Sequence, residues 1–442
     1  MVGTPIVIVG SGFAAAAAVV HLVDHGIPCK ALTVVGPGAL GAGQAYGCVS
    51  PFFRLNVRPD IQRLWPEQPD HFPDWARRHI NDPQAQTPLG PFYRRSDFAR
   101  YITDELQRLP NYDALNHLSH VVIDIRREQN RWILTTDKGS EITASRVVIA
   151  TGNPSPQWPG GIDAPTEPSL VRVPWRGDWI HEVDRQSPVC LVGSGLTAMD
   201  ALYALHETDH QGPVYVLSPY GLLPPVQLDW KSSPAIEWPS VHNARSFVKA
   251  MRGTLKNDEW LDQEWQERFE ALRVGLSAAW QQLPVHERLK LMHRLGWLWS
   301  LQRFRASPHT VQAVHRMRER GQLNIIRASM LGLSASRSKQ WLVSLSDDES
   351  IACRTVINCT GAGRDPLIDK LASHQIIGTL SAGGAPSVNA QQQLVSPDDV
   401  AHQDLFLIGA SSTLALGDVV GSTSIARQAV QLAKTVCSIR AG

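Results

Sequence analysis

The sequence lacks the features that mark several specialised classes of protein. Lys plus Arg number 42 and Asp plus Glu number 41, so a formal net charge of +1 provides no field that would gather nucleic acid or an anionic membrane. The six cysteines lie far apart, with no Cys-x-x-Cys pair and no His/Cys ligand spacing, which argues against a disulfide scaffold and a metal site. This cysteine usage favours reduced thiols in a cytoplasmic protein.

A membrane anchor is also not expected. The apolar run at residues 5–23 imitates one, but no Lys or Arg precedes it and two glycines interrupt it. The chain has 442 residues, of which 43% are hydrophobic and 19% charged, a composition that folds into two or three domains. We therefore expect a soluble protein without nucleic-acid or membrane partners, and leave homo-oligomerisation open.

A glycine-rich turn follows the first apolar run. Residues 6–9 are β-branched, as a buried parallel strand requires, and an alanine-rich helix is predicted to about residue 24. Between them, Gly10 permits a tight turn, Gly12 lets the backbone approach a pyrophosphate, and the small Ala15 allows the helix to pack on the strand. The acid that usually ends the next strand is replaced by Gly36.

The same pattern returns later in the chain. A strand at 189–192 is followed by a second glycine turn, a helix to about 207 and a strand at 214–217. Each unit also contains a hairpin that leads into an apolar strand ending in Thr-Gly, and the two copies, 132–152 and 341–361, are 209 residues apart throughout. The repeat predicts an α/β protein with two Rossmann-like dinucleotide-binding domains, because two such units are unlikely to be ligand-free turns.

A helical insertion interrupts the second unit at about residues 230–321. Its leucines repeat at helical spacing, and its many tryptophans favour core or interface packing, with a wall of a substrate cleft as the alternative. Arg303 and Arg305 could meet an acidic substrate or face solvent, and solvent is favoured.

Several short sequence motifs, in a characteristic order along the chain, carry a resemblance to a known family. The sequence resembles the bacterial FAD-NAD(P)-binding family related to flavin-dependent amino-acid N-hydroxylating monooxygenases, over nearly the whole chain. The resemblance implies an FAD domain in residues 1–154 and 356–442, interrupted by an NAD(P) domain in residues 155–355 that contains the helical insertion. The motifs are Gly43-Gln44-Ala45-Tyr46-Gly47, Leu55-Asn56-Val57, Pro69-Asp70-His71-Phe72 with Trp75, Arg95 with Phe98 and Tyr101, Gly195-Leu196-Thr197, Gly221-Leu222-Leu223-Pro224 and Asn358-Cys359-Thr360-Gly361.

The resemblance also assigns roles to residues. Asn56 would lie near the isoalloxazine ring as the catalytic candidate, or would be a turn residue capping its own backbone. Arg95 would neutralise a phosphate or hold a substrate carboxylate, unless it is an exposed helical arginine. The implied FAD contacts are Gly10, Gly12, Ala15, Gly152, Gly361, Gly409 and Asp418, and the implied contacts to the nicotinamide coenzyme are Gly193, Gly195 and Thr197.

The activity implied is that of a flavin-dependent monooxygenase. It would use FAD, NADPH or NADH, and O2 to N-hydroxylate an amine or amino-acid-like small molecule in specialised metabolism. An NAD(P)H-dependent flavin reductase or a flavin oxidase shares every motif, and a non-catalytic nucleotide-binding protein is the alternative of another class. Because Ser218, Pro219 and Tyr220 offer neither acid nor base after the strand of the second unit, NADPH and NADH are expected to differ by less than about a hundredfold.

Overall fold

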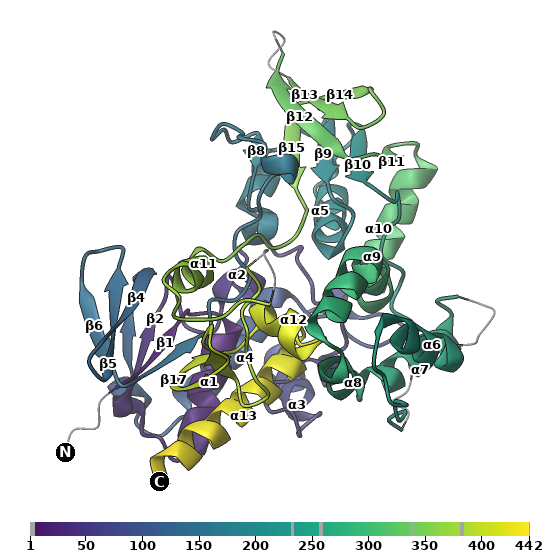
Figure 1. The fold of residues 1–442 in the computed structure, drawn as a ribbon. Helices are drawn as coiled ribbons and strands as arrows, with labels where there is room; N and C mark the ends of the chain where they lie inside the picture. Colours follow the sequence, from purple (N-terminus) through teal and green to yellow (C-terminus); the bar gives the residue numbers. More distant parts are fainter. Residues whose placement is uncertain (1–4, 231–233, 256–259, 337–339, 381–383, 442) are drawn as a thin grey trace.

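The computed structural model describes residues 5–230, 234–255, 260–336, 340–380 and 384–441. Two mainly parallel sheets organise it, the first in the lower part of Figure 1 and the second in the upper part. The first sheet has the strand order β16-β17-β7-β1-β2-β3, with β16 antiparallel to β17. Its strands are β1 (Ile6–Val9), β2 (Leu32–Val35), β3 (Asn116–Leu118), β7 (Arg146–Ile149), β16 (Gln393–Val395) and β17 (Ala401–Leu407).

Different elements pack on the two faces of the first sheet. Ile6 and Ile8 of β1 pack with helices α1 (Phe13–Asp24) and α13 (Ser422–Ala441), which lie side by side. Val7 and Val9 point to the other face, toward the antiparallel sheet of β4 (Val122–Glu128), β5 (Arg131–Thr136) and β6 (Glu141–Ala144). Because both faces are covered, every residue of β1 is buried, which accounts for its β-branched sequence.

The second sheet repeats this plan. Its order is β11-β10-β9-β15-β8, and its strands are β8 (Leu170–Val171), β9 (Val189–Val192), β10 (Val214–Ser218), β11 (Leu323–Arg327) and β15 (Thr355–Asn358). One face packs on α5 (Leu196–Glu207) and α10 (Pro308–Glu319), and the other on β12 (Met330–Ala335), β13 (Trp341–Leu345) and β14 (Ser350–Cys353). The predicted repeat of hairpin and strand is thus confirmed.

The predicted boundary between residues 355 and 356 is wrong. Strand β15 pairs with β9 in the second sheet, with Thr355 opposite Val189, as β7 pairs with β1 in the first. The repeat itself requires this, since β15 is the counterpart of β7. The chain crosses back only after β15, where Gly363 N–H donates to the carbonyl of Pro154 at 3.3 Å, so the two crossing segments touch.

The helical insertion is shorter than predicted, and it docks on the first domain although the second unit contains it in sequence. Helix α10 joins β10 to the parallel strand β11 and packs on α5, so it belongs to the second unit. The insertion itself docks on the first domain, where Trp280 Nε1 donates to the carbonyl of Leu414 at 2.9 Å. Its helices are α6 (Ala244–Thr254), α7 (Gln263–Arg273), α8 (Leu276–Gln282) and α9 (Val285–Arg303), and α8 contacts α12 (Thr413–Leu416).

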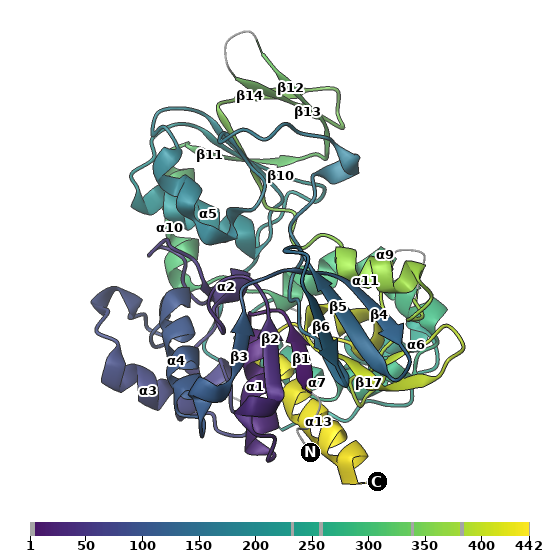
Figure 2. The same ribbon diagram turned by 90° about the vertical axis from the view of Figure 1, so that its left-hand side faces the viewer.

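Further helices flank the first sheet (Figure 2), and aromatic side chains of α3 and α4 pack in its core. None of the described helices is long and apolar enough to cross a membrane. The remaining helices are α2 (Gly43–Tyr46), α3 (His71–His79), α4 (Arg95–Gln107) and α11 (Pro366–Ser373). Short 3-10 turns lie at Cys29–Ala31, Pro59–Ile61, Pro83–Ala85, Tyr112–Ala114, Pro159–Gly161, Pro174–Arg176, Asp178–Glu182 and Ala410–Ser412.

Candidate cofactor and substrate site

The loop between β1 and α1 is built from glycine for steric reasons. Gly10 has φ +119°, and a Cβ there would lie 2.2 Å from the carbonyl oxygen of Ala150. Gly12 begins α1 without a side-chain cap, so the first N–H groups of the helix have no side-chain acceptor. Across the loop, a Cβ on Gly43 would lie 2.6 Å from Gly12 Cα. These glycines form a backbone cradle at a helix N-terminus, which fits a pyrophosphate.

The acid expected after β2 is missing for a structural reason. A Cβ on Gly36 would lie 2.5 Å from the carbonyl carbon of Gly10 and from the Ser11 nitrogen. The end of β2 therefore packs against the turn itself, and no side chain fits at this position. The absence of the acid consequently says little about whether the cradle binds a dinucleotide.

The loop between β9 and α5 has the same construction. Gly193 has φ +108°, and a Cβ there would lie 2.4 Å from the carbonyl oxygen of Cys359. Gly195 begins α5, again without a side-chain cap and with open space where a Cβ would stand. Thr197 Oγ1 accepts a hydrogen bond from Trp175 Nε1 at 3.3 Å.

The other predicted cofactor residues lie at the carboxyl ends of the strands. Gly152 and Gly361 both have positive φ and no atom within 4 Å of a built Cβ, so a ligand can approach their backbone closely. Gly409 lies two residues after the end of β17, next to helix α1, with Ala14 Cβ 3.9 Å from its built Cβ. Ala15 is fully buried where α1 packs on the sheet. The structure thus places these residues around the two cradles, and their contacts to cofactor stay predictions.

Arg95 lies between the two domains. Its Nη2 is 2.5 Å from Asp200 Oδ2, so α4 of the first domain is paired with α5 of the second. Burial raises the pKa of Asp200 to about 6, although Arg95 opposes the shift. Beside the pair is a cavity of about 10 Å³, room for about one water, lined by Phe53, Arg95, Pro174, Trp175, Trp179, Thr197 and Asp200. Arg95 is therefore neither exposed nor free, and an anion-binding role for it stays a prediction.

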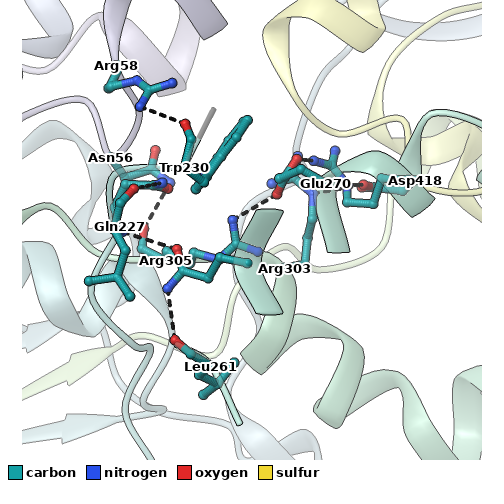
Figure 3. Close-up of polar contacts among 12 residues, drawn as sticks. Asn56, Arg58, Gln227, Trp230, Leu261, Glu270, Arg303, Arg305 and Asp418 are labelled. Atoms are coloured by element: carbon teal, nitrogen blue, oxygen red, sulfur yellow. Dashed lines mark hydrogen bonds and ion pairs between the residues drawn. The ribbon is translucent and has the colours of Figure 1, made fainter. Parts of the chain in front are cut away.

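Asn56 lies where the insertion meets the first domain. Its Nδ2 donates to the carbonyl of Arg305 at 3.4 Å (Figure 3). The insertion leaves and returns at this point, because Gln227 N–H donates to the carbonyl of Ala306 at 2.9 Å. Arg58 donates to the carbonyl of Trp230 at 3.2 Å and lies over its ring, which covers the same region. Asn56 is thus part of a contact between domain and insertion.

Next to Asn56, five charged side chains form a charge cluster: Glu270, Arg273, Arg303, Arg305 and Asp418. Asp418 Oδ2 accepts from Nε of Arg273 and of Arg303, each at 2.7 Å. Glu270 accepts from Arg305 Nη1 at 2.8 Å and also pairs with Arg273. The prediction that Arg303 and Arg305 face solvent is wrong, since their side chains are only 14% and 3% exposed. Asp418 is engaged by these arginines, and whether it also contacts flavin stays a prediction.

The charge cluster has an uncompensated positive charge. Burial raises the pKa of Asp418, but the neighbouring Arg273 and Arg303 outweigh it and hold that pKa below its usual value. Burial lowers the pKa of Arg305 to about 10, with Glu270 opposing. Three guanidinium groups thus face two carboxylates, and Nε and Nη2 of Arg305 have no hydrogen-bond partner in the described part of the chain. A buried cation with unpaired donors favours an anionic ligand.

Sequence reasoning missed several of these residues. The role of Gly43 could have been suspected from the sequence, because residues 36–47, which follow the first dinucleotide unit's second strand, are rich in glycine. Asp200 had no such signal, because its partner Arg95 is 105 residues away in the sequence. Glu270 had none either, because an acidic residue three positions before an arginine on a helix is ordinarily an exposed pair.

Comparison with known proteins agrees with this geometry. Residues 7–154 match the model of a family described as FAD-NAD(P)-binding. This segment is similar to that family. The match covers the first cradle, Asn56 and Arg95, and it confirms the resemblance that the sequence motifs indicate. No curated protein sequence matches the chain.

Solved structures share the fold over the full length. Ornithine N-hydroxylase from Kutzneria sp. 744, described with reduced FAD, NADP+ and L-ornithine, is 15% identical, with a TM-score of 0.64 and 99% of each chain covered. The cadaverine monooxygenase of desferrioxamine biosynthesis from Erwinia amylovora, bound to FAD, is 12% identical, with a TM-score of 0.68 and coverage of 98% of this chain and 94% of that one. Thioredoxin reductase from T. acidophilum is 11% identical, with a TM-score of 0.55 and 99% of each chain covered. The fold is therefore that of two-domain FAD/NAD(P) flavoproteins, as the sequence predicts.

Proposed function

We propose that this protein is a flavin-dependent monooxygenase that uses NADPH or NADH and O2 to N-hydroxylate an amine that also carries a carboxylate. The observation that carries the proposal is the pair of glycine cradles at helix N-termini, at Gly12 and Gly195, in one chain whose fold resembles that of an ornithine N-hydroxylase and a cadaverine monooxygenase. One cradle suits FAD and the other suits the coenzyme that reduces it.

The residues present fit both groups. Gly10, Gly12 and the N-terminus of α1 would hold the FAD pyrophosphate, and Gly193, Gly195 and Thr197 would hold the diphosphate of the nicotinamide coenzyme. Bound flavin supplies electron transfer from NAD(P)H and the activation of O2 for oxygen transfer to the amine. The chain's own tasks are to orient these groups and to exclude water.

The charge cluster supports the choice of a carboxylate-bearing substrate. Arg305 presents Nε and Nη2 without partners among the described residues, at a position where its side chain is almost wholly buried. A carboxylate would supply both the missing negative charge and two acceptor oxygens. Asn56, hydrogen-bonded to the Arg305 backbone, would then lie beside the substrate and help to position it.

The flavin reductase and flavin oxidase alternatives share both cradles and stay open until product is analysed. A reductase that works through a dithiol has less support, because the six cysteines are free and five of them are buried. A hydrogen bond with Cys353 and burial raise the pKa of Cys190 well above its usual value, so Cys190 is a poor source of thiolate. The non-catalytic alternative loses its main argument as well, because packing at Gly36 explains the missing acid.

Isotope labelling with matched amines tests the proposal. The FAD-loaded protein is given NADPH, ¹⁸O₂ and either ornithine or putrescine, which differ by the carboxylate, and then lysine or cadaverine. We expect labelled N-hydroxylated product with the amino acids and at least tenfold lower kcat/KM for the diamines. Product without label, or peroxide alone with every amine, would leave the oxidase or reductase.

Two variants assign the carboxylate contact. Arg305→Gln is expected to lower kcat/KM for the amino acids by tenfold or more and to leave the diamines nearly unchanged. Arg294→Gln, which changes an exposed arginine on α9, is the matched control and should behave as the parent protein. Equal losses for amino acids and diamines in Arg305→Gln would show that the residue is structural only.

A further inference from the structure

The end of β10 lacks a side chain suited to the ribose of a coenzyme. Ser218 is buried, and its hydroxyl accepts a hydrogen bond from the Gly221 N–H at 2.9 Å, so it serves the turn. Tyr220 stacks on Trp297 of α9, with ring centroids 3.9 Å apart and an interplanar angle of 17°. This stacking holds the turn after β10 against the insertion. The segment therefore offers a fixed backbone and no charge.

The neighbouring strand, β11, contributes a positively charged side chain beside the end of β10. In the parallel pair of β10 and β11, Ser218 lies opposite Arg327, and both residues end their strands at the carboxyl edge of the sheet. The turn passes directly over this arginine, because a Cβ built on Gly221 would lie 3.2 Å from Arg327 Cβ. The carboxyl edge of such a sheet is where dinucleotides bind, with the adenosine ribose at the end of the second strand.

Arg327 is available for a ligand. It is exposed, and no hydrogen bond or ion pair to it is recorded within the described residues. A guanidinium group is always protonated at neutral pH and matches the geometry of a phosphate with two parallel donors. An arginine with these properties at a ribose position is the group that an adenosine 2′-phosphate requires.

The first unit provides an internal comparison. Val35 and Leu118 pair at the ends of β2 and β3, as Leu217 and Ile326 do in β10 and β11. One residue further along, Arg327 therefore takes the place of Ser119 in the first unit. The first unit, assigned to FAD, has a neutral residue there, and FAD has no 2′-phosphate to recognise.

We propose that Arg327 binds the adenosine 2′-phosphate of NADPH and makes the second unit selective for NADPH over NADH. The proposal rests on the proposed function, which assigns a nicotinamide coenzyme to this unit. It supplies a contact that Ser218, Pro219 and Tyr220 do not, and the preference expected from one such contact stays within the sequence-based limit of about a hundredfold.

Calorimetric titration with two fragments tests this site without turnover. The FAD-loaded protein is titrated with adenosine 2′,5′-bisphosphate and with adenosine 5′-monophosphate. We expect the bisphosphate to bind about tenfold to a hundredfold more tightly, as one charge-assisted contact provides. Arg327→Gln should abolish this preference while leaving the affinity for the monophosphate unchanged. Arg320→Gln, an exposed arginine that precedes β11 at the opposite edge of the sheet, should retain it.

The outcomes separate the two proposals. Equal binding of both fragments to the parent protein, or a preference that survives in Arg327→Gln, would overturn the role of Arg327 and leave the coenzyme site in place. If neither fragment binds the parent protein, the assignment of a nicotinamide coenzyme to the second unit is wrong, and the role of Arg327 is wrong with it.

Discussion

The two dinucleotide units of this chain share a backbone and differ in the side chains that surround it. Gly10 and Gly193 occupy equivalent turns, where a Cβ would lie 2.2 Å from the carbonyl oxygen of Ala150 and 2.4 Å from that of Cys359, respectively. Helices α1 and α5 both begin at a glycine without a side-chain cap. The common glycine geometry makes a place for a pyrophosphate and does not choose between cofactors.

The differences lie at equivalent positions around this geometry. Buried Ala17 of α1 corresponds to Asp200 of α5, which forms the ion pair with Arg95, and Ser119 corresponds to Arg327. The insertion also docks on the first unit through buried ion pairs of Asp418 with Arg273 and Arg303. An internal repeat therefore indicates which variations carry specificity, because each unit serves as the reference for the other.

The largest effect on stability is expected at the contact that only the first unit has. Asp418→Asn leaves Arg273 and Arg303 without their shared carboxylate, and breaking a buried ion pair costs about 3–5 kcal/mol. Urea unfolding measures the loss. Asp178→Asn, which removes an exposed partner of Arg176, should change the free energy of unfolding by less than about 1 kcal/mol. Similar small losses in both variants would contradict the structural role of the charge cluster.

Substitutions in the turns test what the two units share. Gly10→Ala and Gly193→Ala each introduce a Cβ against a carbonyl oxygen at positive φ, and each should lower the free energy of unfolding by about 3 kcal/mol. Gly195→Ala meets no atom within 4 Å and should cost less than about 1 kcal/mol. Thermal unfolding of the three variants measures this order. If Gly10→Ala lowers the free energy of unfolding and Gly193→Ala does not, the two turns are not structurally equivalent.

A smaller, pH-dependent effect is expected from Asp200, which has no counterpart in the first unit. Its pKa is about 6 in the folded protein, against an ordinary value of 3.8. The folded state therefore binds a proton more tightly than the unfolded state, so this group favours folding below about pH 4 and loses that contribution as the pH rises through 6. The loss is up to about 3 kcal/mol for two pKa units.

The matched variant for this effect is Asp200→Asn. Between pH 4.5 and pH 7 the parent protein should lose stability relative to the variant in urea unfolding, because only the parent has the titrating carboxyl. Parallel pH profiles for the two proteins would show that the carboxyl is not perturbed in the fold.

Features that are local in sequence could be predicted, and contacts between distant segments could not. The strands at 6–9 and 189–192 and the glycine turns that follow them are encoded in short stretches, and the 209-residue repeat establishes the second copy. The position of β15 follows from the same repeat, in which β15 is the counterpart of β7, and the domain boundary comes after this strand.

The site residues divide in the same way. The requirement for glycine at residues 10 and 193 follows from local backbone geometry, so both could be identified. Burial of Arg305 depends on the insertion docking against the first domain, and the position of Arg327 depends on the pairing of β10 with β11, 109 residues beyond Ser218. Neither arrangement has a periodicity or spacing that reveals it.

The central claim is that the first cradle holds FAD and the second holds the coenzyme that reduces it. The most direct test is the flavin content of Gly12→Val and Gly195→Val, together with anaerobic reduction by NADPH. We predict that Gly12→Val contains no FAD and still binds adenosine 2′,5′-bisphosphate, whereas Gly195→Val retains FAD that dithionite reduces and NADPH does not. Normal flavin content in Gly12→Val, or reduction of Gly195→Val by NADPH at the parent rate, would contradict the account.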